Sequence, residues 1–395
     1  MFAVKGLGEE AAGQLRTCGD NSVRRSPPTQ QFSRLPTLHV INGRFGAQRV
    51  TGVQRVAHGL LSALDAIDGL PGRWRLLSPA GVAWPPLRRI EFMSSAWPPG
   101  AGHGWEQIAV AIAATRGARV LNIAGSGPWL GGAQVSWLHD AAVFDHPEAY
   151  RPAFVAWYRE LFRQRARRGD LLITPSENAR ARLAHHLGLP MSRLAVLAHG
   201  SDHLDEVQPD STCLREHGLT PGSYWLSVAS ANPTKNLGRL LEAQRRVPAA
   251  ERRPLVLVGG RHARVFAPDG GNPAPVGIVR VDRPLDACLK ALLLGARALW
   301  LVSTYEGFGL PAAEAMRCGC AVVASRAGAL PETCGDAARY VDPLDVDDIA
   351  SAMVSLGRDD AEIARLRQAG LRRMQGFTWA RSAERLLGML QEWPA

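Results

Sequence analysis

Long apolar runs and paired cysteine motifs are both missing from this chain of 395 residues. No run of apolar residues reaches the roughly 18 that a membrane-spanning helix needs. Glu9 and Glu10 stand where a signal peptide would have its apolar segment. The six cysteines form no pair of Cys-x-x-Cys motifs, so we expect no structural zinc site. We expect them to be buried free thiols in a reducing, cytoplasmic compartment.

The glycine pattern of a dinucleotide-binding oxidoreductase is also absent. A buried strand is predicted at LHVIN (residues 38–42), and the loop that follows it reads GRFGAQRVTG. An oxidoreductase of the Rossmann type needs Gly-x-Gly-x-x-Gly there and an acidic residue about 20 positions later. The loop does not fit that pattern, which excludes this class of enzyme.

Basic residues outnumber acidic ones, 46 Lys and Arg against 36 Asp and Glu, which gives a net charge of +10. Such a charge suits nucleic acid, an anionic membrane surface or a phosphate-bearing substrate. Eight arginines between residues 151 and 182 are interleaved with aromatic residues. This pattern is typical either of a helix on an anionic membrane or of a helix with a buried aromatic face. No nucleic-acid-binding module is recognisable, so we expect no nucleic-acid partner.

Apolar strand patterns alternate with helical patterns in two successive series. The length of the chain and its apolar share of 46% allow two domains, each with its own core. Two such series predict an α/β fold with two Rossmann-like, doubly wound domains that face a cleft. We assign residues 1–36 to a loose N-terminal extension, 37–205 to the first domain, 206–376 to the second domain and 377–395 to a C-terminal helix.

The most informative segment is STYEGFGLPAAEAM at residues 303–316, which follows an apolar strand and precedes a helix. Its loop is expected at the carboxyl end of that strand, where open α/β sheets bind ligands. Gly307 and Gly309 permit close approach of the backbone, and the N-terminus of the following helix favours a diphosphate. The carboxylates of Glu306 and Glu314 can accept hydrogen bonds from sugar or ribose hydroxyls.

Glu306 and Glu314, with GFGLP between them, resemble the E-x7-E motif of the family 4 retaining glycosyltransferases, which have the GT-B fold. The resemblance extends over residues 37–390 and implies that the C-terminal helix crosses back to the first domain. It also implies transfer of a hexose from a nucleoside diphosphate to an acceptor hydroxyl with retention of configuration. The further matching segments are TGVQRVAHGL, WLHDAAVF, NPTKNLGRLLEA, GALPETCGDAARYVDPLDVDDIA and FTWARSAERLLGML.

The resemblance implies a role for each matching residue of the donor site. Glu306 would contact hydroxyls of the transferred sugar, and Glu314 would bind the ribose. Lys235 would neutralise the diphosphate, whose charge grows in the transition state, so that neither a metal nor another cofactor is required. Backbone N–H groups of the intervening loop would hold the sugar and the diphosphate. The loop residues are Gly307, Phe308, Gly309 and Leu310.

The resemblance also implicates residues of the first domain. His139 matches the family's histidine near the C6 hydroxyl of the sugar, although a histidine at a strand end is more often structural. Gly52 matches a glycine that approaches the donor phosphates or the acceptor. Asp140, Thr51 and Arg55 are candidates for acceptor contact, with a solvated loop in which Thr51 caps the next helix as the alternative.

One departure from the family pattern concerns the diphosphate. Family members often carry an arginine about six residues before the lysine, whereas this chain reads VASANPTKN. Neither Ala229 nor Ser230 can supply that charge. Arg261 or Arg264, after the next predicted strand, is the candidate replacement.

These features together predict a glycosyltransferase of bacterial surface polysaccharide or glycolipid synthesis. Mannose is the favoured hexose and GDP-mannose the favoured donor, because TGVQR and HDAAVF resemble mannosyltransferases of bacterial polysaccharide assembly. We expect a cytoplasmic protein, and attachment to the inner face of the membrane with a lipid-linked saccharide acceptor stays an alternative. A pseudoenzyme that binds nucleotide sugar without turnover is the second alternative reading.

Overall fold

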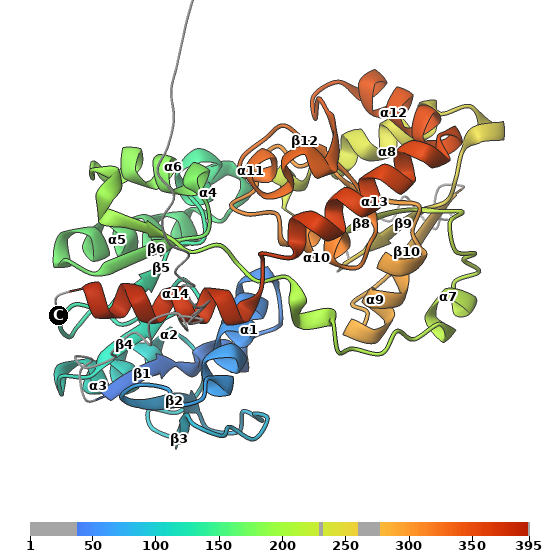
Figure 1. Ribbon diagram of the computed structural model, residues 1–395. Helices are drawn as coiled ribbons and strands as arrows, with labels where there is room; N and C mark the ends of the chain where they lie inside the picture. The colour runs from blue at the N-terminus through green and yellow to red at the C-terminus, as the bar shows by residue number, and fades with distance from the viewer. Residues whose placement is uncertain (1–37, 229–231, 260–276, 394–395) are drawn as a thin grey trace, which may run out of the picture. The chain divides into compact units, whose positions relative to one another are not determined.

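Two parallel β-sheets form the framework of the chain in the computed structural model, which describes residues 38–228, 232–259 and 277–393 (Figure 1). The first sheet has seven strands in the order β3-β2-β1-β4-β5-β6-β7, and the second has six in the order β10-β9-β8-β11-β12-β13. The strands of the first sheet are β1 (Leu38–Asn42), β2 (Arg73–Pro79), β3 (Glu91–Ser95), β4 (Arg119–Asn122), β5 (Val135–Trp137), β6 (Leu171–Thr174) and β7 (Leu194–Val196). Those of the second are β8 (Trp225–Val228), β9 (Leu255–Val258), β10 (Ile278–Val281), β11 (Ala298–Leu301), β12 (Ala321–Ser325) and β13 (Ala338–Val341).

Helices lie in most of the connections between consecutive strands, whereas residues 80–90 join β2 to β3 and residues 123–134 join β4 to β5 without a helix. Around the first sheet they are α1 (Gly52–Ala66), α2 (His103–Trp105), a π-helix (Glu106–Val110), α3 (Ala111–Thr115), α4 (Ala142–Asp145), α5 (Pro152–Arg168) and α6 (Glu177–Leu187). Around the second they are α7 (Thr212–Glu216), α8 (Leu237–Arg246), α9 (Asp286–Gly295), α10 (Leu310–Arg317), α11 (Leu330–Cys334), α12 (Val346–Arg358) and α13 (Asp360–Met374). The last helix, α14 (Trp379–Glu392), packs against α1, where the ring of Trp379 leaves no room for a Cβ atom at Gly59.

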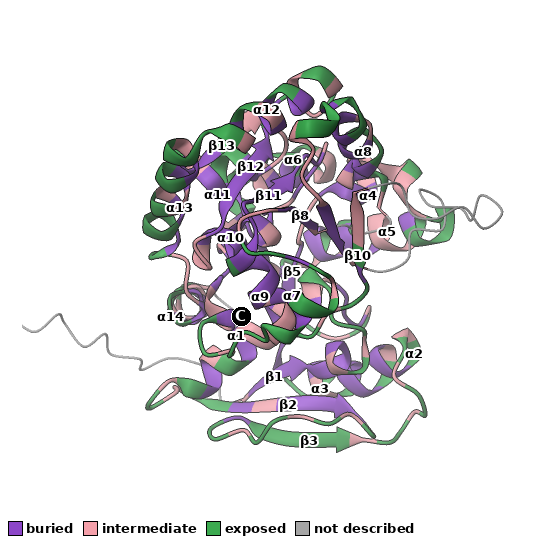
Figure 2. Ribbon diagram, turned by 90° about the vertical axis from the view of Figure 1, so that its right-hand side faces the viewer, coloured by how far each residue is buried: buried purple, intermediate pink, exposed green. Residues whose placement is uncertain are grey.

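Burial follows the hydrophobic pattern of the strands. β9 and β12 are buried at every residue, as expected of central parallel strands covered on both faces. Figure 2 shows the contrast with β3, an edge strand that is exposed along most of its length. The exposed β3 lacks the apolar run that identifies a buried strand, so the sequence did not reveal it.

Each sheet has one point at which the chain order reverses. In the first sheet it lies between β1 and β4, where Ile41 pairs with Leu121, and in the second it lies between β8 and β11, where Leu226 pairs with Leu299. Ligands of open α/β sheets bind outside the carboxyl ends of the strands at such a point. The fold therefore offers two equivalent positions for a site, one in each sheet.

The arginine-rich segment at residues 151–182 is divided between two helices. α5 and α6 are separated by β6, and the N-terminus of α6 is capped by Ser176, whose Oγ accepts a hydrogen bond from Ala179 N. Arg165 on α5 is buried and lies 3.5 Å from the carboxylate of Asp170. The arginines therefore do not form one continuous basic face.

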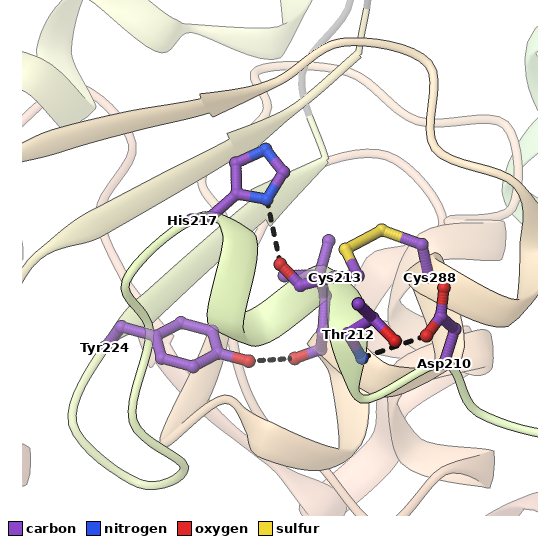
Figure 3. Close-up of a disulfide and its surroundings, with 7 residues drawn as sticks. Asp210, Thr212, Cys213, His217, Tyr224 and Cys288 are labelled. Atoms are coloured by element: carbon purple, nitrogen blue, oxygen red, sulfur yellow. Dashed lines mark hydrogen bonds between the residues drawn. A yellow bond between two sulfur atoms is a disulfide. The ribbon is translucent and has the colours of Figure 1, made fainter.

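The expectation of free thiols is wrong for two cysteines. Cys213 on α7 and Cys288 on α9 form a disulfide with a Cα–Cα distance of 5.5 Å (Figure 3). They are 75 residues apart in the sequence and come together because α7 packs against α9. Cys318, Cys320 and Cys334 are free.

Burial raises the pKa of two of the free thiols, Cys320 and Cys334, to about 12 in each case. A thiol needs to ionise to react, so these two are inert packing residues. Within the described ranges, no helix has the length and apolar character needed to cross a membrane.

Candidate active site

Lys235 and Glu306 meet at the switch point of the second sheet. Lys235 ends a short 3-10 helix (Pro233–Lys235) that follows β8, and Glu306 lies in the loop that follows β11. The two loops are joined where Thr304 N donates a hydrogen bond to Thr234 O at 2.7 Å. Parallel strands bring their carboxyl ends to one edge of the sheet, so both charged side chains lie at that edge.

The two charges are in direct contact. Lys235 Nζ donates to Glu306 Oε1 at 2.7 Å, and Ser303 Oγ donates to the same oxygen at 2.7 Å. The side chain of Lys235 is 21% exposed and that of Glu306 9% exposed. The pair is therefore sheltered but still accessible, as a site that exchanges an internal partner for a ligand requires.

The loop between Glu306 and α10 needs glycine for two separate reasons. A Cβ atom at Gly307 would lie 2.5 Å from His139 O and 2.7 Å from Asp140 Cβ, so no larger residue fits there. Gly309 has φ = 91°, which favours glycine, and caps the N-terminus of α10. The side chains of Phe308 and Leu310 are buried, so the loop can offer a ligand only its backbone.

His139 lies beside this loop as a neutral, partly buried imidazole. Its Nε2 is 2.8 Å from Ile123 O, and because a carbonyl only accepts, Nε2 carries the proton and Nδ1 is left as an acceptor. Burial lowers the pKa of His139 to about 4. The ring centroid of His199, whose pKa burial also lowers, is 5.8 Å away. An unprotonated Nδ1 is suited to accept a hydrogen bond from a hydroxyl.

Asp140 joins the same group of residues. Its Oδ1 accepts a hydrogen bond from Ala142 N at 2.8 Å. Burial, and to a lesser extent the charge of Glu306, raises the pKa of the Asp140 carboxyl. The structure therefore brings together Lys235, Glu306, the Gly307 loop, His139 and Asp140, which the sequence placed in three separate segments.

Glu314 is held by residues that the sequence analysis did not connect with it. His203 Nε2 lies 2.9 Å and Arg55 Nε 3.4 Å from Glu314 Oε1. Arg55 also makes two hydrogen bonds to Asp286, at 2.7 and 3.0 Å. His203 stands 111 residues from Glu314, and Asp286 stands 231 residues from Arg55. Neither residue belongs to a recognisable motif, so the sequence analysis missed both.

Thr51 and Gly52 lie at the N-terminus of α1. Thr51 is the residue that caps the helix, and its backbone N donates to Gln54 Oε1 at 3.2 Å. A Cβ atom at Gly52 would meet nothing within 4 Å. Protein packing therefore does not explain this glycine, whereas Thr51 has a structural role as a cap.

The replacement for the missing arginine stays a prediction. Ala229, Ser230, Arg261 and Arg264 lie outside the described residues. Over the part of the chain that the structure describes, there is no group of three or more His, Cys, Asp or Glu side chains that could hold a metal ion.

Comparison with known proteins finds a family model that matches the part of the chain around the second sheet. Residues 223–359 match the family described as glycosyl transferases group 1. The chain is 31% identical over 255 residues to O-antigen chain mannosyltransferase B of Escherichia coli, a match that covers 62% of this chain and 66% of that protein. It is also 31% identical over 255 residues to MMP alpha-(1->4)-mannosyltransferase of Mycolicibacterium hassiacum, with 61% and 59% covered. Each match spans less than two thirds of the relative's length.

Solved structures extend the similarity to the whole described fold. Sucrose-phosphate synthase of Thermosynechococcus elongatus superposes with a TM-score of 0.72 at 18% identity, and the match covers 90% of this chain and 98% of that chain. HepE of Anabaena, in complex with UDP-glucose, gives a TM-score of 0.64 at 15% identity, with 90% and 99% covered. The predicted α/β fold of the GT-B type is confirmed by these similarities.

Proposed function

We propose that this chain, a glycosyltransferase with a group 1 domain at residues 223–359, transfers a hexose from a nucleoside-diphosphate sugar to an acceptor hydroxyl. The observation that carries the proposal is the contact between Lys235 and Glu306 at the switch point between β8 and β11. A cation for phosphate and a carboxylate for hydroxyls stand together where the fold binds ligands. The N-terminus of α10, beside them, adds backbone N–H donors and a positive dipole.

Entry of the donor exchanges the partners of this ion pair. The diphosphate takes the Lys235 ammonium, and hydroxyls of the transferred sugar take the Glu306 carboxylate, which Ser303 holds in place. Negative charge grows on the leaving diphosphate as the sugar departs, and the fixed ammonium stabilises it most in the transition state. Lys235 therefore carries out the neutralisation for which other enzymes use a metal ion.

We propose transfer with retention of configuration, in which the leaving diphosphate accepts the proton of the acceptor hydroxyl on the same face of the sugar. The groups around the pair support this proposal. The pKa of His139 is lowered to about 4, so this side chain is weakly suited to act as a general base at neutral pH. His139 Nδ1 instead accepts a hydrogen bond from a hydroxyl of the transferred sugar.

Mannose, supplied as GDP-mannose, is the donor that we propose. Two relatives at 31% identity are by name mannosyltransferases, and one of them acts on the O-antigen chain. A bacterial surface polysaccharide or glycolipid, carried on a lipid at the inner face of the membrane, is the proposed acceptor. Thr51 at the N-terminus of α1 and Asp140 are the proposed residues on the acceptor side, and Gly52 is proposed to approach the donor phosphates.

Thermal unfolding with a panel of nucleotide sugars tests this function. GDP-mannose, GDP-fucose, UDP-glucose and UDP-N-acetylglucosamine are compared, and a donor at 100 times its Kd adds about 2.7 kcal/mol to the free energy of unfolding. Glu306→Ala is expected to lose transfer while it stays folded, and Glu384→Ala, on the exposed face of α14, serves as the matched control. Proton NMR of the product then reads the anomeric configuration.

The outcomes separate the alternatives. If no nucleotide or nucleotide sugar stabilises the protein, the donor assignment is wrong. Stabilisation by a nucleotide sugar without product from any offered acceptor would favour the pseudoenzyme. An inverted product would contradict the retaining mechanism while leaving the donor site in place.

A further inference from the structure

The chain passes between the elements of the first sheet and those of the second sheet in two segments, and these segments are hydrogen-bonded to each other. One is the stretch after β7 that contains Ser201, Asp202 and His203, and the other precedes and opens α14. Ser201 N donates to Phe377 O at 2.9 Å, and Trp379 N donates to Asp202 Oδ1 at 2.9 Å. These bonds hold the chain immediately before His203, and Lys290 Nζ, which donates to Leu204 O at 2.8 Å, holds it immediately after. Together they limit where the His203 side chain can lie.

The side chain of His203 bridges Trp379 and Glu314. Trp379 Nε1 lies 3.4 Å from His203 Nδ1, and His203 Nε2 lies 2.9 Å from Glu314 Oε1. An indole N–H can only donate, so Nδ1 accepts, and Nε2 carries the proton that it donates to the carboxylate. Trp379 thus selects the tautomer of His203 that can hold Glu314.

The consequence for Glu314 is a fixed orientation of its carboxylate. Its side chain is 6% exposed, and its contacts with His203 and with Arg55 both involve Oε1. Among the described residues no other group shares the carboxylate, so Oε2 is the oxygen that can receive a hydroxyl of the ligand. A carboxylate held at one oxygen loses less conformational entropy when the second oxygen binds.

We propose that His203 is a positioning residue for the nucleotide: it holds the Glu314 carboxylate in the orientation that accepts the ribose hydroxyls of the donor. The inference rests on the proposed function, because it assigns Glu314 to the ribose. It adds that the orientation of Glu314 on α10 depends on His203, which lies between β7 and α7. The tautomer of His203 depends in turn on Trp379, the first residue of α14.

Steady-state kinetics with varied donor tests this role. His203→Ala is expected to raise the KM for the donor about tenfold with kcat within about twofold, because ground-state and transition-state binding of the ribose are weakened alike. His203→Gln keeps an N–H donor and should stay within about threefold of the wild-type KM. In a Glu314→Ala background, His203→Ala should have no further effect on the KM.

His217→Ala is the matched control. His217 also makes one hydrogen bond through a ring nitrogen, from Nδ1 to Cys213 O at 2.8 Å, but it lies on the α7 side of the disulfide shown in Figure 3. Its loss removes the same kind of bond without touching Glu314, so the KM should not change. Circular dichroism melts check that each variant folds, and His203→Asn, too short to reach Glu314, replaces the alanine variant if that one does not fold.

The results distinguish this inference from the function on which it rests. If the wild-type protein binds no nucleoside diphosphate, the proposed function and the positioning role of His203 are both wrong. If it binds one but His203→Ala and His203→Asn leave the KM unchanged, or the effect of His203→Ala persists fully without Glu314, only the positioning role is refuted. If His217→Ala raised the KM for the donor as much as His203→Ala does, the rise would reflect general destabilisation of the protein, and the proposal would be overturned.

Discussion

Replacing Gly328 with alanine should displace the carboxylate of Glu306 in the proposed active site, although the two residues are 22 positions apart in the sequence. Gly328 follows β12 and has φ = 55°. A Cβ atom there would lie 2.7 Å from Glu306 N and still closer to Glu306 O. Both are backbone atoms, and Glu306 O is also held by the N–H of Ala329 at 2.9 Å. The loop therefore cannot relieve the overlap by turning a side chain.

The size of the effect follows from these distances. An ordinary van der Waals contact begins near 3.4 Å, so the backbone of Glu306 must move by about 1 Å, and a misplacement of that size costs about 100-fold in rate. The left-handed backbone adds about 1–2 kcal/mol of strain for alanine, and the overlap adds about 1–3 kcal/mol. We expect kcat/KM of Gly328→Ala to fall about 100-fold and the protein to lose several kcal/mol of stability.

Gly319→Ala separates backbone strain from displacement. Gly319 ends α10 with φ = 69°, so alanine suffers similar strain, but the nearest atoms to its Cβ are 3.6 Å away on Leu371. This control should lose about 1–2 kcal/mol of stability and keep wild-type kcat/KM. Transfer assays and urea unfolding of both variants give the two quantities. Wild-type kcat/KM in folded Gly328→Ala, or equal kinetic losses in both variants, would refute the reasoning.

Three further predictions follow from single residues of the structure. Lys235→Ala should lower kcat about 10²- to 10³-fold at saturating donor, and an unchanged kcat would remove Lys235 from the diphosphate site. Cys213→Ser should lower the free energy of urea unfolding by about 2–4 kcal/mol, and a reductant should do the same to the wild type but not to the variant. The pKa of His139 is lowered to about 4 in the folded protein, so the unfolded chain binds more protons between about pH 4 and 6.5 and stability should fall as the pH falls through that window. Thermal melts of His139→Gln should show a weaker dependence of stability on pH than those of the wild type. An unaltered pH dependence would mean that another group is responsible for it.

The features that the sequence revealed are those whose causes lie within a few residues. Ser176 caps α6 and Gly188 ends it with φ = 64°, both as the pattern of start and stop residues predicts. Glu306 and Glu314 were found through their spacing in one strand-loop-helix segment. The parallel α/β fold is confirmed and residues 223–359 match the glycosyl transferases group 1 family, whereas the donor, the acceptor and the retaining mechanism stay predictions.

The features that the sequence did not reveal depend on which distant segments the topology brings together. Cys213 and Cys288 pair because α7 packs on α9, and neither spacing nor composition contains that contact. Arg55 was expected on the acceptor side, and the structure places its guanidinium between Asp286 and Glu314. Pairings over such separations are set by the order of strands in the two sheets, which residue patterns determine only through the whole fold.

The two switch points differ in a way that favours the proposed donor site in the second sheet. At the first, Arg44 and Glu106 form a pair at 3.2 Å, Ser126 binds both, and their side chains are only 7% and 1% exposed. A ligand phosphate would have to break a buried, fully hydrogen-bonded pair and leave the Glu106 charge without its partner, which costs about 3–5 kcal/mol. At the second, Lys235 is 21% exposed and is bound to Glu306, which itself gains hydroxyl partners when the ligand enters. Replacing the carboxylate partner of the cation by a phosphate is therefore costly for Arg44 in the first sheet and nearly balanced for Lys235 in the second. The greater exposure of Lys235 favours the second sheet as the place where this fold binds a diphosphate.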